Sequence, residues 1–479
     1  MADSNRQFID PRTLKGFQDL LPEEAIPRRG VIAKIESVYQ RYGFVPLDTP
    51  ALEHLDVLLG TGGEETNKEL FRMESPEGEP IALRFDLTVP FARLLAQYPD
   101  RLKAPFRRYA LGPVWRADKP GPGRFRQFMQ VDIDAAGSES VAVDAEIIAI
   151  MCEVMATLNV PSYRAMVNNR KVIDALLIGC GIVEASRQKH VLRVIDKLAK
   201  VGADNVRLEL GPGRIDDSGD PIPGVKLDSA TIEKLLHFVG IGGSNRLEVV
   251  AHMEQELPSG SLTDQAIREM RLLAEALDAL GVDERHAHFD PSLARGLDYY
   301  TGPVFEMTLP DAPQLGSVMG GGRYDGLVSR FSDRAIPSTG MSIGLDRLLT
   351  ALGQMGLVEK PRTLVQVLVV SLGGVPERET LRLASELRTA GFRVEAYFGK
   401  KSNLKNQLSH ADHYQIPVAV IVGGDELEKG VVSVKDLLEG KRQRESIEDR
   451  EEYRQAGKTG QVTVPRSQMV STIRELLGR

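Results

Sequence analysis

The segment from Gly112 to Asp134, GPVWRADKPGPGRFRQFMQVDID, constrains the fold more than any other part of the chain. Two strand-like runs flank KPGPG, whose prolines and glycines are typical of a tight turn, so the segment predicts an antiparallel hairpin. Alternate residues of a strand share one face. In the second strand the odd positions, from Phe125 to Ile133, are mostly apolar and suit packing. The other face carries Arg124, Arg126, Phe128, Gln130, Asp132 and Asp134.

This second face is sorted along the strand, with cations near the turn and carboxylates far from it. An ordinary hairpin with one solvated face would explain the alternation. The order indicates instead a ligand with an anionic end and a cationic or hydrogen-bonding end. Guanidiniums suit phosphate, an aromatic ring suits a stacked base, and carboxylates or amides suit an amine or an imidazole. From the pattern alone, both interpretations stay open.

The rest of the chain predicts several domains, since 479 residues correspond to roughly three domains of ordinary size. EEAIPRRGVIAKIESVYQRYG predicts an amphipathic helix, FVPLDTPALE a strand, and EPIALRFDLTVPFARLLA an antiparallel segment. Residues 171–280 are mostly helical in pattern, and we interpret them as an inserted domain whose charged faces carry no obvious chemistry. After the linker LVEKPRT, strands alternate with short helices, which predicts a small α/β domain with a largely parallel sheet.

Composition excludes some classes of protein. The hydrophobic share of 42% and the charged share of 27% fit a soluble globular chain, and no apolar run is long enough to span a bilayer. The net charge of −7 argues against a protein that coats nucleic acid without specificity, but it allows a local basic surface. The N-terminus resembles no leader, and Cys152 and Cys180 form no metal-type cluster, so we expect reduced thiols and a cytoplasmic location.

Two further patterns could suggest a cofactor. GGGRYDGL has neither the G-x-G-x-x-G of a dinucleotide site nor the lysine and hydroxyl of a P-loop, and its glycines more simply allow close approach of the backbone. The pairs His286/His288 and His410/His413 have no third ligand at a useful spacing, so we predict no metal site built by the protein.

The same segments resemble a known family. The hairpin resembles motif 2 of class II aminoacyl-tRNA synthetases, and specifically that of histidyl-tRNA synthetases. KGFQDLLPEE and YGFVPLDTPALE, with Pro50, are similar to that family's N-terminal segment and motif 1, and GMSIGLDRLL is similar to its motif 3. LRFDLTVPFAR is similar to its amino-group-binding strand, and ARGLDYYTGPVFE and GGGRYDGL to its two histidine-specific motifs. The C-terminal segment resembles its anticodon-binding domain.

The resemblance implies an α+β catalytic core with an antiparallel sheet, a helical insertion and a C-terminal α/β domain. It also implies a homodimer built around motif 1. We therefore expect a first part of the core at residues 1–170, the insertion at 171–280, a second part of the core at 281–360 and an anticodon-binding-like domain at 364–479.

The resemblance implies that the chain is a histidine–tRNA ligase. ATP, accompanied by Mg²⁺, and histidine would give histidyl-adenylate and pyrophosphate, and histidine would then pass to the 3′ end of its tRNA. The substrate carboxylate attacks the α-phosphate, so negative charge builds up that fixed guanidiniums stabilise, and no cysteine or serine nucleophile is needed. We expect the tRNA acceptor end at the motif 2 hairpin and the anticodon at the C-terminal domain, where GKKSNLKNQ is a candidate contact.

The resemblance assigns five residues to ATP. Arg116 would hold the α-phosphate, and Phe128 would stack on adenine. Arg347 would lie on the other face of adenine or at the γ-phosphate, while Arg124 would reach the distal phosphates. Asp118 would lie near the adenine amino group, where the family usually has glutamate.

Arg295 would be the family's distinctive catalytic arginine, beside the α-phosphate, so the expected catalytic set is Arg116, Arg295 and Arg347. Bacterial members usually have QFHQLGCE where this chain has QFMQVDID, which makes the pocket carboxylate an aspartate, one methylene shorter. The expected histidine site consists of Asp86 and Thr88 at the α-amino group, Gln130 and Asp134 at the substrate, and Tyr299, Tyr300 and Tyr324 around the imidazole, together with Arg116 and Arg295.

Other functions are compatible with the same fold. One is a synthetase-like regulatory subunit of the histidine-biosynthesis ATP phosphoribosyltransferase, whose members lack the anticodon domain and tend to lose catalytic residues. Others are a non-catalytic tRNA-sensing module and a different class II synthetase. The presence of Arg116, Arg295 and Arg347, and of a C-terminal domain, favours the ligase.

Overall fold

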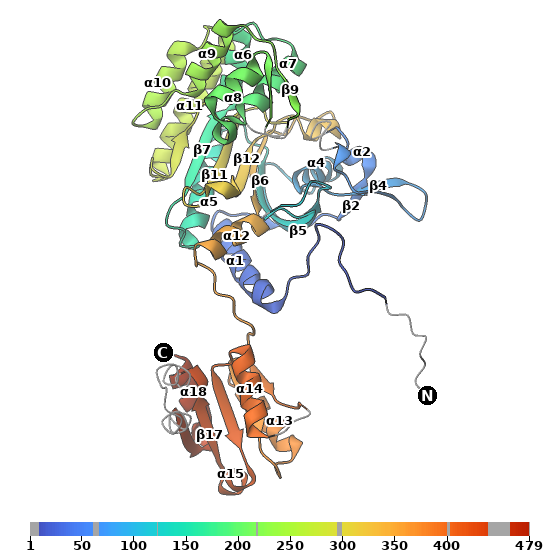
Figure 1. Ribbon diagram of the computed structural model, residues 1–479, viewed down its shortest axis with the longest axis vertical. Helices are drawn as coiled ribbons and strands as arrows, with labels where there is room; N and C mark the ends of the chain where they lie inside the picture. Colours follow the sequence, from blue (N-terminus) through green and yellow to red (C-terminus); the bar gives the residue numbers. More distant parts are fainter. Residues whose placement is uncertain are drawn as a thin grey trace. The chain divides into compact units, whose positions relative to one another are not determined.

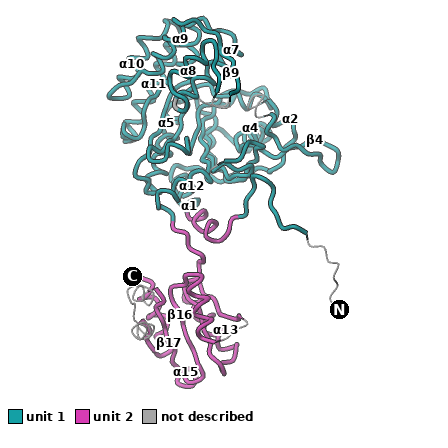
Figure 2. The backbone as a smooth tube through the Cα atoms, viewed as in Figure 1, with its two compact units in different colours: residues 1–19, 31–358 teal, residues 20–30, 359–479 magenta. Residues whose placement is uncertain are grey.

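The computed structural model describes residues 9–60, 67–121, 123–216, 219–294, 299–399, 403–438 and 460–478. The chain forms two compact units, each of which is described by itself below. Unit 1 comprises residues 1–19 and 31–358, and unit 2 comprises residues 20–30 and 359–479 (Figure 2). Within the described ranges, no helix is both long and apolar enough to cross a membrane.

An eight-stranded sheet forms the body of unit 1 (Figure 1). Its strand order is β1-β5-β6-β13-β12-β11-β7-β10. Along this order, every pair of neighbouring strands between β5 and β7 is antiparallel. The short end strands run parallel to their neighbours, β1 to β5 and β10 to β7. The predicted antiparallel core is therefore confirmed. The strands are β1 (Val45–Pro46), β5 (Phe106–Trp115), β6 (Gln127–Ala136), β7 (Arg164–Asn169), β10 (Ala287–Phe289), β11 (Pro303–Thr308), β12 (Met319–Arg323) and β13 (Ser338–Gly344).

The predicted hairpin is present as β5 and β6. The two strands pair from Trp115 opposite Gln127 near the turn to Phe106 opposite Ala136 at the far end. On its odd-numbered face, β6 places Val131 in an apolar cluster with three helices that cover this side of the sheet. Since that face is buried from Val131 to Ala135, the register of the strand is fixed by packing. The helices are α1 (Pro22–Arg41), α5 (Val141–Thr157) and α12 (Leu345–Gln354).

The opposite face of β6 is also shielded from water, although it is polar. Gln130, Asp132 and Asp134 are only 7%, 1% and 2% exposed. A hairpin with one solvated face, the simpler interpretation of the sequence, is therefore excluded. Buried carboxyl and amide groups need partners, so this face calls for a ligand or for other side chains.

A small three-stranded sheet and the helix after it approach this polar face. The segment EPIALRFDLTVPFARLLA, predicted as extended, is a strand only to Leu83, and a helix begins at Thr88. The correction has a physical reason: Asp86 Oδ1 accepts a hydrogen bond from Val89 N at 3.1 Å, and Pro90 fits the first turn of a helix. The elements are β2 (Leu52–His54), α2 (Leu55–Leu58), β3 (Arg72–Glu74), β4 (Pro80–Leu83) and α4 (Thr88–Gln97).

The segment predicted as a helical insertion folds into helices gathered at one end of unit 1, with one two-stranded ribbon (Figure 1). Asp228 and Asn245 cap two of these helices, because their side chains accept hydrogen bonds from backbone N–H groups of the first turn. The elements are α6 (Arg170–Gly179), α7 (Ala185–Ile195), α8 (Leu198–Leu210), β8 (Gly213–Ile215), β9 (Pro221–Pro223), α9 (Ser229–Val239), α10 (Arg246–Glu256) and α11 (Ser261–Ala279).

Unit 2 is a five-stranded sheet in the order β15-β14-β16-β17-β18. The first three strands are parallel and the last two antiparallel, so the sheet is mixed rather than largely parallel. Alternate residues of β14 enter two separate apolar clusters, one on each face. The elements are β14 (Val367–Ser371), α13 (Glu377–Thr389), β15 (Val394–Ala396), α14 (Leu404–Tyr414), β16 (Val418–Val422), α15 (Gly424–Lys429), β17 (Val431–Asp436), β18 (Gln461–Pro465) and α18 (Met469–Leu477).

Candidate active site

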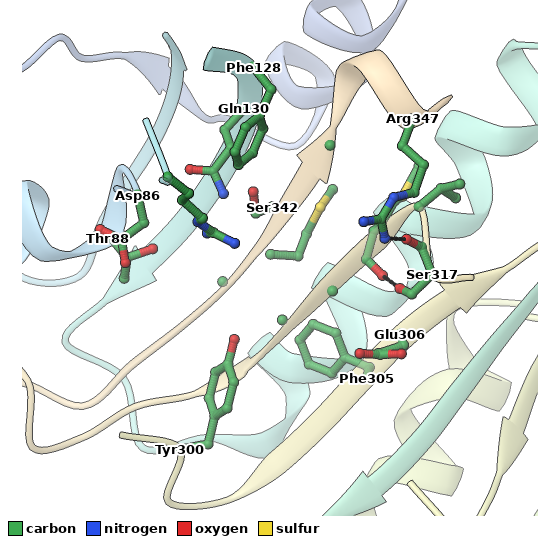
Figure 3. A pocket seen from close by; sticks show the side chains of 18 of the residues that line it. Asp86, Thr88, Phe128, Gln130, Tyr300, Phe305, Glu306, Ser317, Ser342 and Arg347 are labelled. Atoms are coloured by element: carbon green, nitrogen blue, oxygen red, sulfur yellow. Dashed lines mark hydrogen bonds between the residues drawn. The ribbon is translucent and has the colours of Figure 1, made fainter. Parts of the chain in front are cut away.

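A cavity of about 750 Å³ opens on the polar face of β6 in unit 1. Its volume lies in the usual range for small-molecule sites. In Figure 3, Asp86 and Thr88 lie on one side of the cavity and Arg347 lies on the other. Phe128 and Gln130 project between them from β6. The pocket therefore combines an acidic side, a basic side and an aromatic ring.

Asp86 provides the acidic side. It is 3% exposed, and its Oδ2 atom is buried without a hydrogen-bond partner. Burial raises the pKa of Asp86 to about 6, although the hydrogen bond from Val89 and the charge of Arg116 oppose this shift. A buried, unpaired carboxylate oxygen facing a cavity suits an ammonium group.

Two arginines lie at the aromatic and basic parts of the pocket. Arg116 Nε donates to Phe85 O at 3.1 Å, and its guanidinium carbon lies 5.2 Å from the centre of the Phe128 ring. Arg347 Nη1 donates to Ser317 O at 2.6 Å (Figure 3). Backbone oxygens thus hold both guanidiniums in place before any ligand binds, which is the preorganisation that charge stabilisation requires.

The rim of the pocket is formed near the hairpin turn by Asp118 and Arg124, both of which are exposed. Asp118 Oδ1 accepts a hydrogen bond from Lys119 N at 2.6 Å. Because these side chains lie in water, they can meet the outer part of a ligand but do not set its orientation as a buried group would.

A group of tyrosines closes the remaining end. The ring centres of Tyr299 and Tyr300 are 5.0 Å apart, and those of Tyr299 and Tyr324 are 5.8 Å apart. Burial is the main cause of the raised pKa of all three tyrosines, so their hydroxyls are neutral donors. Tyr324 donates to Asp134 Oδ1, whose second oxygen lies 2.6 Å from Nη2 of the buried Arg108.

Glycines on β12 and β13 make room for these groups. A Cβ atom at Gly340 would overlap the Asp134 carboxylate and lie 2.5 Å from Ile133 O. A Cβ atom at Gly322 would lie 3.0 Å from the ring of Tyr300. The glycine-rich segment therefore serves close approach of side chains to the backbone, as the sequence indicated, and not a phosphate loop.

Comparison with known proteins decides the family. A family model described as "Histidyl-tRNA synthetase" matches residues 16–348, and one described as "Anticodon binding domain" matches residues 366–476. The chain belongs to the histidyl-tRNA synthetase family. A curated "Histidine--tRNA ligase" of Paracoccus denitrificans is 41% identical over 505 residues, which cover 100% of this chain and 100% of the relative.

Solved structures of the family agree with the fold. The crystal structure of the histidyl-tRNA synthetase from Nostoc sp. PCC 7120 has a TM-score of 0.80 at 32% identity and covers 98% of this chain and 100% of its own. A second, described as an ATP phosphoribosyltransferase regulatory subunit/histidyl-tRNA synthetase from Bacillus halodurans, has a TM-score of 0.69 at 22% identity and covers 87% of this chain and 100% of its own. At that identity the likeness shows the fold alone.

The pocket of this histidyl-tRNA synthetase family member brings together all predicted site residues except Arg295. Arg295 lies outside the described residues. The role of each residue stays a prediction. The predicted residues that line the pocket are Asp86, Thr88, Arg116, Asp118, Arg124, Phe128, Gln130, Asp134, Tyr299, Tyr300, Tyr324 and Arg347.

The sequence interpretation missed some pocket residues. Glu306 of β11 and Ser342 of β13 line the pocket, and Lys189 and Arg193 of α7 reach its wall from the insertion. The charged faces of the insertion, which we expected to carry no chemistry, therefore include part of the pocket. The spacing of Lys189 and Arg193, one helical turn apart in the basic run SRQKHVLR, was the signal available in the sequence.

Proposed function

We propose that this chain is a histidine–tRNA ligase that uses the pocket of unit 1 to make histidyl-adenylate and then transfers histidine to the 3′ end of its tRNA. One observation carries the proposal. A single pocket joins an aromatic ring and fixed guanidiniums to a recess built from a carboxylate and tyrosines. ATP needs the first set, and histidine, with its ammonium and imidazole groups, needs the second.

ATP lies along the basic part of the pocket. Phe128 stacks on adenine, and Arg347 lies on the other face of the base or at the γ-phosphate. Asp118 and Arg124, at the rim, meet the adenine amino group and the distal phosphates. Both rim side chains are exposed, which fits contacts with the outer part of the nucleotide.

Histidine lies between Asp86 and the tyrosines. Asp86 and Thr88 accept the α-amino group, and this places the substrate carboxylate toward the α-phosphate. Gln130 orients the substrate. Asp134 accepts a hydrogen bond from the imidazole inside the recess formed by Tyr299, Tyr300 and Tyr324.

Adenylation joins two anions. The substrate carboxylate attacks the α-phosphate, the bond to pyrophosphate breaks, and negative charge grows on the phosphate oxygens. Arg116, held by the carbonyl of Phe85, stabilises that charge. Arg295 is the second cation at the α-phosphate, by resemblance to the family. Both arginines are permanently charged, so this stabilisation needs no proton transfer.

Mg²⁺ accompanies ATP and reduces the charge of its phosphates. Glu306 is a carboxylate of the pocket wall that lies near Ser317 in Figure 3, below Arg347, and its oxygen atoms fit a hard cation. Phosphate oxygens and water would complete the coordination shell.

The tRNA contacts both units in this proposal. Its acceptor end meets the β5–β6 hairpin, whose exposed Lys119 offers a charge to phosphate. Its anticodon meets unit 2, which the anticodon-binding model matches. Within the candidate segment GKKSNLKNQ, residues 400–402 lie outside the described residues, and Asn403 caps α14.

We include a homodimer and a cytoplasmic location in the proposal. The short strands near motif 1 expose large apolar side chains: Val45, Leu52 and Met73 are 46%, 43% and 42% exposed. Exposed apolar groups on edge strands are typical of a surface that a partner covers. The regulatory-subunit alternative is less favoured, because residues 366–476 match the anticodon-binding model.

The test is ATP–pyrophosphate exchange with a panel of amino acids. Histidine alone should support exchange by the purified chain. Exchange driven by proline, glycine or threonine, with histidine inert, would contradict the assignment.

A further inference from the structure

A buried cluster of charges lies behind the imidazole recess, and the mechanism above uses only one of its members, Asp134. It consists of Arg108 on β5 and of Asp132 and Asp134 on β6. Their exposed fractions are 1%, 1% and 2%. The cluster holds two acidic side chains beside one guanidinium, and only Asp134 lines the pocket.

Arg108 is fixed from several sides. Its Nη2 atom lies 2.6 Å from Asp134 Oδ2 and donates to Leu87 O at 2.9 Å. Its guanidinium carbon lies 4.6 Å from the centre of the Phe91 ring. These contacts leave the guanidinium no route to solvent, so it must balance its charge within the protein.

Asp132 lies beside this pair, and the Ser342 side chain is close enough to lower its pKa through a hydrogen bond. In the sheet it faces Ala110 on β5 and Ser342 on β13, whereas Asp134 faces Arg108 and Gly340. Asp132 and Asp134 are therefore successive members of one face, and Arg108 is within reach of both. Ser342 lies opposite Asp132 in the ladder and lines the pocket.

Several charged or titratable groups from neighbouring elements act on Asp132. They are Arg108 and Asp134 in the cluster, Asp86 and Arg84 in the segment before α4, and Tyr39 of α1. Arg84 donates to backbone oxygens of Thr49 and Pro113, so it is already engaged elsewhere.

One acid of the cluster must carry a proton at neutral pH, because one fixed guanidinium compensates one carboxylate. Burial is the main cause that raises the pKa of Asp132 to about 8, and Asp134 adds to this while Arg108 opposes it. Burial also raises the pKa of Asp134, but Arg108, which touches it directly, and the hydrogen bond from Tyr324 both lower that pKa and favour the charged form. Asp134 is therefore the ionised member and Asp132 the neutral one.

We propose that Arg108 and Asp132 are positioning residues for histidine recognition. Arg108 holds the Asp134 carboxylate toward the imidazole. Asp132 stays a neutral acid, so that the Arg108 guanidinium forms an ion pair with Asp134 alone. The inference rests on the proposed function, since it assigns Asp134 to the imidazole. The proposal predicts how histidine affinity changes when Asp132 ionises. When Asp132 loses its proton, it competes for Arg108, Asp134 is held less firmly, and histidine binds more weakly.

The test compares the pH dependence of the histidine KM in ATP–pyrophosphate exchange. In the wild type, the KM should rise by about tenfold between about pH 7 and about pH 9, as Asp132 ionises. In Asp132→Asn the side chain cannot ionise, so the rise should be smaller by about fivefold or more. The kcat should change with pH to the same extent in the wild type and in Asp132→Asn, because the side chain at position 132 does not touch the α-phosphate.

Asp204→Asn is the matched control. It makes the same chemical change on α8 at a fully exposed carboxylate that pairs with Arg207, and it should keep the wild-type pH dependence. Loss of the amino proton of histidine near pH 9 affects all three proteins alike, so the comparison isolates Asp132. Arg108→Gln alone would leave two buried acids without their cation, so Asp132→Asn is the deciding variant.

The outcomes separate the two proposals. A wild type without histidine-dependent exchange contradicts the proposed function. If the wild type is active and Asp132→Asn shows the same rise in KM as Asp204→Asn, the positioning role of Asp132 is wrong. A rise that appears in kcat and not in KM also overturns it, because the charge would then act on the reaction and not on histidine binding.

Discussion

The hydroxyl of Tyr324 is a single group on which the orientation of Asp134 depends. It donates to Asp134 Oδ1 inside a site where both side chains are at most 2% exposed. Hydrogen bonds to buried charged groups contribute about 1.5–3 kcal/mol, so Tyr324→Phe should raise the histidine KM by roughly tenfold or more, with a smaller effect on kcat. Steady-state pyrophosphate exchange measures this. Tyr163→Phe, whose ring stacks on His286 outside the pocket, is the control and should leave the KM unchanged.

Asp132 also gives a prediction for stability. Its pKa is raised from 3.8 to about 8 in the folded chain, so the folded state holds the proton more tightly than the unfolded state. The stability that this proton contributes is complete below about pH 4 and is lost as the pH rises to about 8. Between about pH 6.5 and pH 8, the wild type should lose roughly 2 kcal/mol relative to Asp132→Asn.

Thermal unfolding at a fixed scan rate checks this prediction. Asp86 and Asp144, whose pKa values are raised to about 6, titrate mostly below the chosen range and contribute little to it. Equal decreases of Tm in the wild type and in Asp132→Asn would show that Asp132 is already ionised at neutral pH.

Single residues of the site differed in how far the sequence could assign them. Phe128, Gln130 and Asp134 could be grouped because strand parity depends on their spacing alone. Arg108 and Ser342 could not be joined to them, because β5 and β13 bring them in through strand register, which spacing along one strand does not determine. The role of Asp132 needed its burial, which the alternation alone left open.

At the scale of elements, strand β13 must carry glycine where it passes the Asp134 carboxylate. A Cβ at Gly340 would lie 2.5 Å from Ile133 O, a backbone atom that cannot move freely. Gly340→Ala should therefore lower stability by about 1–3 kcal/mol and raise the histidine KM. Gly353→Ala on α12, where no atom lies within 4 Å of the new Cβ, should be neutral or slightly stabilising. Denaturant unfolding and exchange kinetics on both variants test the pair, and equal effects would contradict it.

Two elements differed from their sequence patterns for local reasons. The pattern around LRFDLTVPFAR is apolar enough for a strand, but Asp86 caps the first turn and a helix forms from Thr88. The charged faces of the insertion were expected to carry no chemistry, yet Lys189 and Arg193 of α7 reach the pocket wall. A helix pattern shows which residues share a face and not what lies opposite that face.

At the scale of the whole molecule, the predicted family and fold class are confirmed, since family models match residues 16–348 and 366–476. They could be predicted because the motifs are spread along most of the chain. The four-part division at residues 170, 280 and 360 stays a prediction. Packing groups the backbone differently, into two units, and assigns residues 20–30 of the N-terminal region to the second unit.

The division into units leads to the last prediction, that adenylation and tRNA use can be separated. All described pocket residues lie between Glu69 and Arg347, and each unit has its own apolar clusters. A chain ending near Pro361 should therefore keep the oligomeric state of the full chain, which we propose is a dimer. It should also keep histidine-dependent pyrophosphate exchange within about threefold of the full chain, because exchange needs only this pocket. Aminoacylation should fall through a raised tRNA KM, since the anticodon contacts are lost.

Pyrophosphate exchange, aminoacylation and sedimentation of the full and the shortened chain measure adenylation, tRNA use and oligomeric state. An unchanged tRNA KM would show that unit 2 does not read the anticodon, and lost exchange in a folded dimer would show that adenylation requires unit 2.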